Sequence, residues 1–157
     1  MIARIICVGK LKESYWRDAM GEYMKRLSRF GKYDIVELPD EPEPQSDSPA
    51  LEEQVKNTEG QKILAQIKPT DIVIALAIDG KQYDSSDLAA RLSEISARGR
   101  VCFVIGGSLG LSKEVLSRAD HKLSFSKMTF PHQLARVILA EQLFRCAKIS
   151  AGQRYHK

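Results

Sequence analysis

The sequence predicts an α/β domain in which a mostly parallel sheet is flanked by helices. Short apolar runs alternate with longer segments whose apolar residues recur at helical spacing, which is typical of strand-helix-strand units. One of the runs, residues 71–78, is almost wholly apolar, as expected of a strand buried on both faces of a parallel sheet. The chain has 157 residues, and we expect one domain over residues 1–157.

The first half of the chain predicts two strands, a loop and two helices. Residues 2–8 form an apolar run of strand length. From about residue 13 to 30, apolar side chains recur at three- and four-residue steps, which predicts a helix with one apolar face. Residues 33–38 are the second expected strand. The acidic, proline-rich segment 39–49 interrupts regular structure and predicts a surface loop, and residues 50–67 return to helical spacing.

The second half continues the same alternation. Residues 71–78 predict a strand, followed by a turn at Asp79-Gly80. Asp84 is placed as the N-cap of a helix that Gly99 ends. Residues 101–105 predict the next strand.

The last third predicts a short helix, a short strand and a long final helix. Ser112 begins the short helix, residues 122–125 form the strand, and Thr129 with Pro131 begins the final helix. The apolar residues of this helix cover more than one face: Leu134, Val137, Ile138 and Leu139. A helix with so wide an apolar arc is buried on two sides, so we expect a homodimer.

Bulk composition limits the partners of the chain. A formal net charge of +4 and a pI of 9.0 point weakly to an anionic partner such as nucleic acid. The three cysteines are far apart and form no C-x-x-C or His/Cys cluster, so we expect neither a disulfide framework nor a metal site. The longest apolar stretch falls far short of the ~20 residues of a membrane span, and the N-terminus lacks a signal-peptide pattern. We therefore expect a cytoplasmic protein that makes no membrane contact.

Three corners of the predicted sheet are candidates for a ligand site. Residues 76–80, 106–110 and 125–130 each follow a strand, and ligands of such sheets bind beyond the carboxyl ends of the strands. The glycines of GGSLG fit neither G-x-G-x-x-G nor a P-loop, which leaves a loop where backbone approaches a ligand closely. A tight turn with packing glycines is the alternative.

Polar side chains in the last third are further candidates. Ser126, Lys127, Thr129 and His132 lie among apolar residues, and such a loop can hold a heterocycle through polar and backbone groups. The alternative is a plain strand-to-helix connection, with His132 as an N-terminal helix residue.

Basic residues of the final helix and the reactive tail are weaker candidates. Arg136, Arg145 and Lys148 lie among apolar neighbours, where phosphate contact competes with a solvated or ion-paired face. Tyr155 and His156 belong to a terminal tail, a position that is usually frayed.

Four segments together closely resemble the RlmH (YbeA-type) branch of the SPOUT methyltransferases: VGKLKESYWRDAMGEYMKRL, IGGSLGLS, LSFSKMTFPHQLARVILAEQLFR and the final YHK. The likeness covers essentially the whole chain. It implies an α/β fold whose C-terminal part is threaded as a trefoil knot, working as a homodimer. It also implies methyl transfer from S-adenosylmethionine to N3 of a pseudouridine in helix 69 of 23S ribosomal RNA, on the assembled ribosome.

The resemblance also implies roles for individual positions. His132, Tyr155 and His156 match positions that face the target base as catalytic residues, and Arg136 and Arg145 match positions that face the RNA. The implied pocket for S-adenosylmethionine consists of Leu76, Gly106, Phe125, Ser126, Lys127, Met128, Thr129 and Phe130.

The chain departs from the family pattern at two positions. Phe144 stands where relatives commonly have tyrosine, and Arg154 stands before the tail where proline is frequent. The first departure removes a hydroxyl and any hydrogen bond from it. The second leaves the path of the tail open.

The chemistry of the implied reaction needs alignment more than acid or metal help. N3 carries a proton that must leave, and histidine is the natural acceptor near neutral pH. Our hypothesis is that Tyr155 and His156 position the base, with His156 or His132 assisting proton removal. Two alternatives remain: a non-catalytic ribosome-binding or assembly factor that uses the basic surface, and a SPOUT methyltransferase that acts on tRNA or on a ribose hydroxyl.

Overall fold

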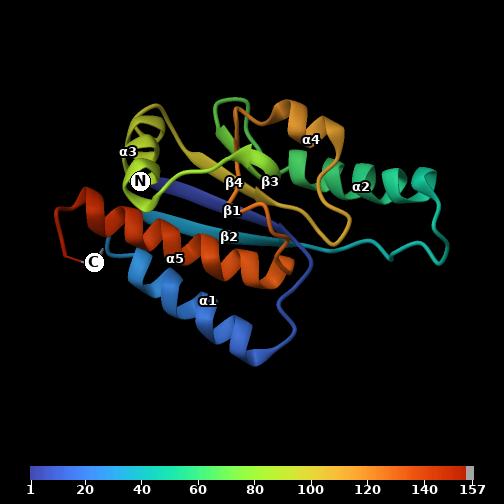
Figure 1. Ribbon diagram of the computed structural model, residues 1–157, viewed down its shortest axis with the longest axis horizontal. Helices are drawn as coiled ribbons and strands as arrows, with labels where there is room; N and C mark the ends of the chain where they lie inside the picture. The colour runs from blue at the N-terminus through green and yellow to red at the C-terminus, as the bar shows by residue number, and fades with distance from the viewer. Residues whose placement is uncertain (155–157) are drawn as a thin grey trace.

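The computed structural model describes residues 1–154 and is built on a five-stranded parallel sheet (Figure 1). The strands lie in the order β2-β1-β4-β3-β5, and all four pairings are parallel. The strands are β1 Ile2–Val8, β2 Lys32–Leu38, β3 Ile72–Lys81, β4 Val101–Ile105 and β5 His121–Leu123. The helices are α1 Ser14–Leu27, α2 Pro49–Leu64, α3 Ser85–Ser96, α4 Lys113–Arg118 and α5 His132–Ser150. The predicted α/β class with a mostly parallel sheet is confirmed.

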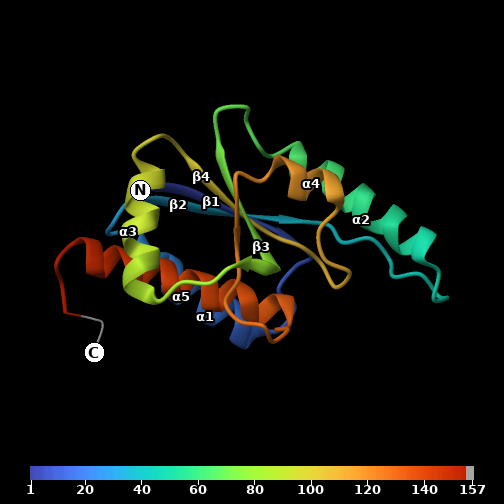
Figure 2. The same ribbon diagram turned by 45° about the horizontal axis from the view of Figure 1, so that its top comes forward.

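Helices cover both faces of the sheet. Figures 1 and 2 show α1, α3 and α5 on one face and α2 with α4 on the other. Successive residues of β1 point to opposite faces, so Ile5 and Cys7 join the core under α1, α3 and α5 while Ile6 and Val8 join the core under α2 and α4. In β4, Phe103 likewise joins the first core and Val104 the second. Burial on both sides explains why β4 is a continuous apolar run.

The parallel register aligns the carboxyl ends of the central strands at one edge. Cys7 of β1 pairs with Ile105 of β4, and Val104 pairs with Ala75 of β3. The segments that follow β1, β3 and β4 therefore leave the sheet together, and Figure 1 shows the start of α5 beside them. No helix within residues 1–154 is long and apolar enough to cross a bilayer. The trefoil knot stays a prediction of the resemblance.

Two predicted boundaries are wrong, both at glycines. The strand does not end before Asp79-Gly80, because β3 continues to Lys81; its register against β5 shifts there, so that Leu76 and Lys81 both lie opposite Leu123. A Cβ atom at Gly80 would lie 2.6 Å from the carbonyl carbon of Leu123, so this glycine permits close approach of two strands. Helix α3 ends at Ser96, before Gly99, because the N–H of Ala97 closes the last turn with αR backbone.

A buried ion pair anchors the start of β3 and gives the fold a specific pH dependence. Asp71 is only 2% exposed at its side chain, and its Oδ1 accepts a hydrogen bond from Nε of Arg100 at 2.8 Å. The hydrogen bonds from Arg100 lower the pKa of Asp71 to about 2, against the opposing effect of burial. A carboxyl group whose pKa is depressed by folding stabilises the protein above its unfolded pKa and loses that contribution as the pH falls.

We therefore expect Asp71→Asn to lower the free energy of unfolding by about 2 kcal/mol at pH 7. The difference from the unchanged protein should shrink as the pH falls from about 4 to about 2. Urea unfolding of both proteins across this range measures it. Asp34→Asn, in a surface pair with Arg4, is the matched control and should cost at most about 1 kcal/mol. A deficit in Asp71→Asn that stays constant with pH would contradict the expectation.

Candidate functional site

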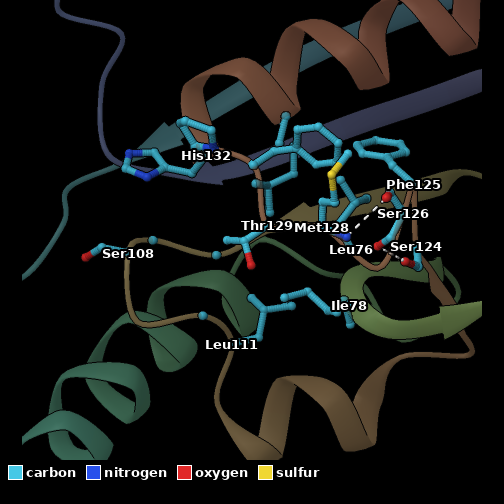
Figure 3. Close-up of a pocket in the computed structure, with 18 of the residues that line it drawn as sticks. Leu76, Ile78, Ser108, Leu111, Ser124, Phe125, Ser126, Met128, Thr129 and His132 are labelled. Carbon is cyan, nitrogen blue, oxygen red and sulfur yellow. Dashed lines mark hydrogen bonds between the residues drawn. The ribbon is translucent and has the colours of Figure 1, made fainter.

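A cavity of about 710 Å³ opens at the carboxyl edge of the sheet. Residues of all three predicted corners form its wall, together with the first turn of α5. In Figure 3 the side chains of Ile78 and Leu111 face Thr129 across this space, and His132 and Ser108 lie at one end. The prediction that the three corners meet in one cleft is confirmed.

The glycine loop after β4 is shaped by its own backbone. Gly110 has a φ of +86°, which favours glycine, and its N–H donates to the carbonyl oxygen of Gly107 at 3.1 Å. A Cβ atom at Gly106 would lie 2.8 Å from both the carbonyl carbon and the oxygen of Gly110. The loop is therefore folded so tightly that no residue with a side chain fits at position 106. At this point the cavity is lined by backbone atoms.

The segment between β5 and α5 forms the opposite wall. The hydroxyl of Ser124 donates to the carbonyl oxygen of Ser126 at 2.9 Å, and the N–H of Met128 donates to the hydroxyl of Ser126 at 3.1 Å (Figure 3). These local bonds set the path of the loop. Of the eight residues named for the cofactor, Lys127 alone is not in the cavity wall, and its side chain is exposed.

Helix α2 supports the glycine loop from behind, through a pair of residues that sequence reasoning missed. A Cβ atom at Gly60 would lie 2.3 Å from the hydroxyl oxygen of Ser112, the N-cap of α4. One residue earlier, Oε2 of Glu59 lies 3.1 Å from the position that a Cβ atom at Gly107 would take. Glycine inside a helix lowers helix stability by about 1 kcal/mol relative to alanine. Gly60 inside a predicted helix therefore could have indicated that another segment packs closely there.

A second cavity, of about 390 Å³, adjoins the first. The two share Gly107, Ser108 and His132. The remaining wall of the smaller cavity is Val8 at the end of β1, loop residues 40–43, and Glu59. Glu59 is 4% exposed, and burial raises its pKa, while the hydrogen bond from the N–H of Glu41 has the opposite effect.

His132 stands where the two cavities meet. It is the first residue of α5 and is half-buried. Burial lowers the pKa of His132, and the positive charge of Arg136 lowers it further. The imidazole is therefore neutral near pH 7 and has a ring nitrogen that can accept a proton.

Arg136, which the resemblance places toward the RNA, is held inside the protein. Its side chain is fully buried, donates to the carbonyl oxygen of Val8, and pairs with Oε1 of Glu37 at 3.1 Å. The same Glu37 oxygen accepts the N–H of Leu11 at 3.0 Å. Arg136 therefore ties the first turns of α5 to the ends of β1 and β2 instead of meeting a phosphate.

The other predicted groups have varied positions. Arg145 is half-buried and pairs with Glu141 one helical turn away. Phe144 is buried and packs against Phe30 with ring centroids 5.9 Å apart. Tyr155 and His156 lie outside the described residues.

Within residues 1–154, neither the cysteines nor a metal-binding cluster gives a second centre of chemistry. All three cysteines are buried and free, and burial raises the pKa of each thiol to about 12. Thiols of this kind stay protonated and unreactive at neutral pH. Among residues 1–154, no group of three or more His, Cys, Asp or Glu side chains is arranged to hold a metal ion.

Comparison with known proteins adds relatives over the full length. The sequence model of a family described as "Predicted SPOUT methyltransferase" matches residues 1–156. The chain is 57% identical to "Ribosomal RNA large subunit methyltransferase H" of Clostridium novyi (strain NT) over 155 residues, 98% of each chain. Proteins of the same name from Bifidobacterium animalis subsp. lactis and Bifidobacterium adolescentis are each 54% identical over 155 residues, again 98% of both chains.

A solved structure supports the fold independently. A "probable methylase family protein" from Haemophilus influenzae Rd KW20 matches with a TM-score of 0.55, covering 99% of this chain and 70% of that one. Its sequence identity is 13%, so the likeness concerns the arrangement of helices and strands alone.

Proposed function

The chain belongs to the SPOUT methyltransferase family, and we propose that it transfers a methyl group from S-adenosylmethionine to N3 of a pseudouridine in helix 69 of 23S ribosomal RNA. The assembled ribosome is the proposed substrate. Relatives with more than half of their residues identical are named large-subunit ribosomal RNA methyltransferases, which supports this class of acceptor. The larger cavity carries the proposal, because three backbone-rich corners surround a space of small-molecule size at the edge where such sheets bind ligands.

The wall of the larger cavity fits S-adenosylmethionine. Its volume of about 710 Å³ lies within the usual range for small-molecule sites. Leu76, Ile78 and Leu111 offer apolar contact for a flat ring, and the glycine loop and residues 125–130 offer backbone N–H and C=O groups for polar edges. When bound, S-adenosylmethionine supplies an activated methyl group on a positively charged sulfur, and a mostly apolar wall suits a donor that loses its charge on transfer.

His132 is the proposed proton acceptor within the described residues. Its lowered pKa leaves the imidazole neutral near pH 7, and its position between the cavities brings it close to both proposed reactants. Tyr155 and His156 are proposed to position the target base, and Arg145 is proposed to face the RNA.

We further propose that the protein works as a homodimer in the cytoplasm, where ribosomes are found. Leu139 and Leu143 of α5 are fully buried in the core of the chain, whereas Leu134, Val137 and Ile138 remain partly exposed. A helix that is apolar on its outer side as well suits a second subunit.

The decisive experiment is incubation of this protein with ribosomes that lack the modification and S-adenosylmethionine labelled in its methyl group, followed by nucleoside analysis. We expect label in methylpseudouridine from the large-subunit RNA of assembled ribosomes. A labelled 2′-O-methyl nucleoside, or label in tRNA, would select a SPOUT methyltransferase with another acceptor. Ribosome binding without transfer, independent of S-adenosylmethionine, would select the non-catalytic assembly factor.

A further inference from the structure

The smaller cavity takes no part in the donor site proposed above and adjoins it across Gly107, Ser108 and His132. We propose that it receives the pyrimidine ring of the acceptor, and that Oε2 of Glu59 accepts a hydrogen bond from the ring N–H that pseudouridine has and uridine lacks. Glu59 is then the residue that determines specificity for pseudouridine. This inference rests on the proposed function and adds to it how the acceptor is recognised.

The charges around the smaller cavity favour a neutral ring over a phosphate. Its wall contains the carboxyl groups of Asp40, Glu41, Glu43 and Glu59, and no lysine or arginine is among its lining residues in the described part of the chain. Carboxylates repel phosphate oxygens and accept hydrogen bonds from N–H groups. At about 390 Å³ the cavity has more room than one pyrimidine ring needs.

Glu59 differs from the other three acids in its burial and in its free oxygen. Asp40 and Glu43 are exposed, and Glu41 pairs with Lys62. Glu59 is 4% exposed, and its Oε1 accepts the N–H of Glu41 at 3.0 Å. No described residue donates a hydrogen bond to Oε2, although this oxygen belongs to a side chain that lines the cavity. Although Glu59 is largely buried, Oε2 is still accessible and belongs to a side chain that lines the cavity, so a ligand there can donate a hydrogen bond to it.

Pseudouridine supplies such a donor at the required edge. Its sugar is attached through carbon, so N1 carries a hydrogen, and N1–H and N3–H flank one carbonyl group. With N3 turned toward the wall shared with the donor site, N1–H lies on the neighbouring edge and is free to meet Glu59. In uridine N1 is bonded to the sugar, and Oε2 would be left without a partner. Sites built to bind a substrate N–H reject analogues that lack it.

The test compares two substrates and two proteins. Ribosomes from cells that lack the pseudouridine synthase for this position carry uridine there, and normal unmethylated ribosomes carry pseudouridine. Single-turnover transfer rates are measured at saturating S-adenosylmethionine for the unchanged protein and Glu59→Gln. Glutamine retains one oxygen to accept the N–H of Glu41. It places an NH₂ group toward the ring, where two donors, this group and N1–H of pseudouridine, face each other without an acceptor.

We expect Glu59→Gln to lower the rate on pseudouridine by about 10- to 100-fold, as for loss of a hydrogen bond to a charged group. The rate on uridine should change less than about threefold, so the preference for pseudouridine falls by nearly the whole factor. Glu53→Gln, on the same helix and paired with Lys56, is the matched control and should keep both rates. Glu59→Asp retains a carboxylate, so we expect it still to prefer pseudouridine. If the glutamine variant fails to fold, this second variant is compared with the unchanged protein instead.

Calorimetric titration with S-adenosylmethionine supplies a readout that needs no transfer. We expect the Kd of Glu59→Gln to stay within about twofold of the unchanged protein. An unchanged preference for pseudouridine in the variant would overturn the inference. A weaker Kd with an unchanged saturated rate would overturn it too, because Glu59 would then serve the amino group of the donor. If the unchanged protein labels neither kind of ribosome, the proposed function fails first and this inference falls with it.

Discussion

Replacing Gly106 with alanine is expected to weaken binding of S-adenosylmethionine by about 100-fold, or about 2.7 kcal/mol. The added Cβ atom would lie 2.8 Å from the carbonyl carbon and oxygen of Gly110, which are backbone atoms and cannot rotate aside. The loop must open, which breaks the hydrogen bond from the N–H of Gly110 to Gly107 and displaces the wall of the cavity. Overpacking of this kind costs about 1–3 kcal/mol in folded cores. Isothermal titration calorimetry measures the Kd directly.

Gly21→Ala is the matched control for the alanine at position 106. Gly21 lies inside α1, and a Cβ atom there meets nothing within 4 Å. This variant should bind S-adenosylmethionine as the unchanged protein does and gain about 0.5–1 kcal/mol of stability from the better helix former. Circular dichroism separates loss of binding from loss of fold. If Gly106→Ala binds normally with its fold intact, the glycine loop is not part of the donor site.

The fold was predictable because its signals are local. The apolar runs of β1, β3 and β4 identify central strands covered on both faces, and helical spacing identifies the segments between them. Asp84 and Ser112 were correctly expected at helix starts, and each accepts an N–H of the following turn. The strand end before Asp79-Gly80 was wrong because β3 continues through a register shift against β5, and its partner Leu123 is far away in sequence.

The candidate site was predictable only in part, because half of it depends on contacts between distant segments. The three corners follow from the rule that parallel strands end at one edge. The support that Glu59 and Gly60 give to the glycine loop does not, because it requires knowing that α2 lies against residues 107–112. The burial of Arg136 was not predicted for a similar reason. Its acidic partner Glu37 lies on β2, and nothing near either residue in sequence indicates the pairing.

Arg136→Met is expected to lower the free energy of unfolding by roughly 3 kcal/mol and the Tm by about 6–12 °C. Methionine keeps much of the length of the side chain but removes its charge and all its donors. The carbonyl oxygen of Val8 would lose its donor, and Glu37 would lose its ion partner at 3.1 Å. Breaking a buried charge pair from one side costs about 3–5 kcal/mol, and the partial exposure of Glu37, at 31%, places the effect near the lower end.

Arg4→Met is the control that compares loss of a more exposed arginine with loss of the buried Arg136. Arg4 pairs with the half-exposed Asp34 at 2.6 Å, and loss of a surface pair costs at most about 1 kcal/mol. Thermal and urea unfolding of both variants give the comparison. If Arg136 instead met RNA phosphate, its variant would keep normal stability and bind ribosomes with a weaker dependence on salt. Full burial predicts the opposite pattern, because a guanidinium held between β1, β2 and α5 does not reach the surface where a phosphate could bind.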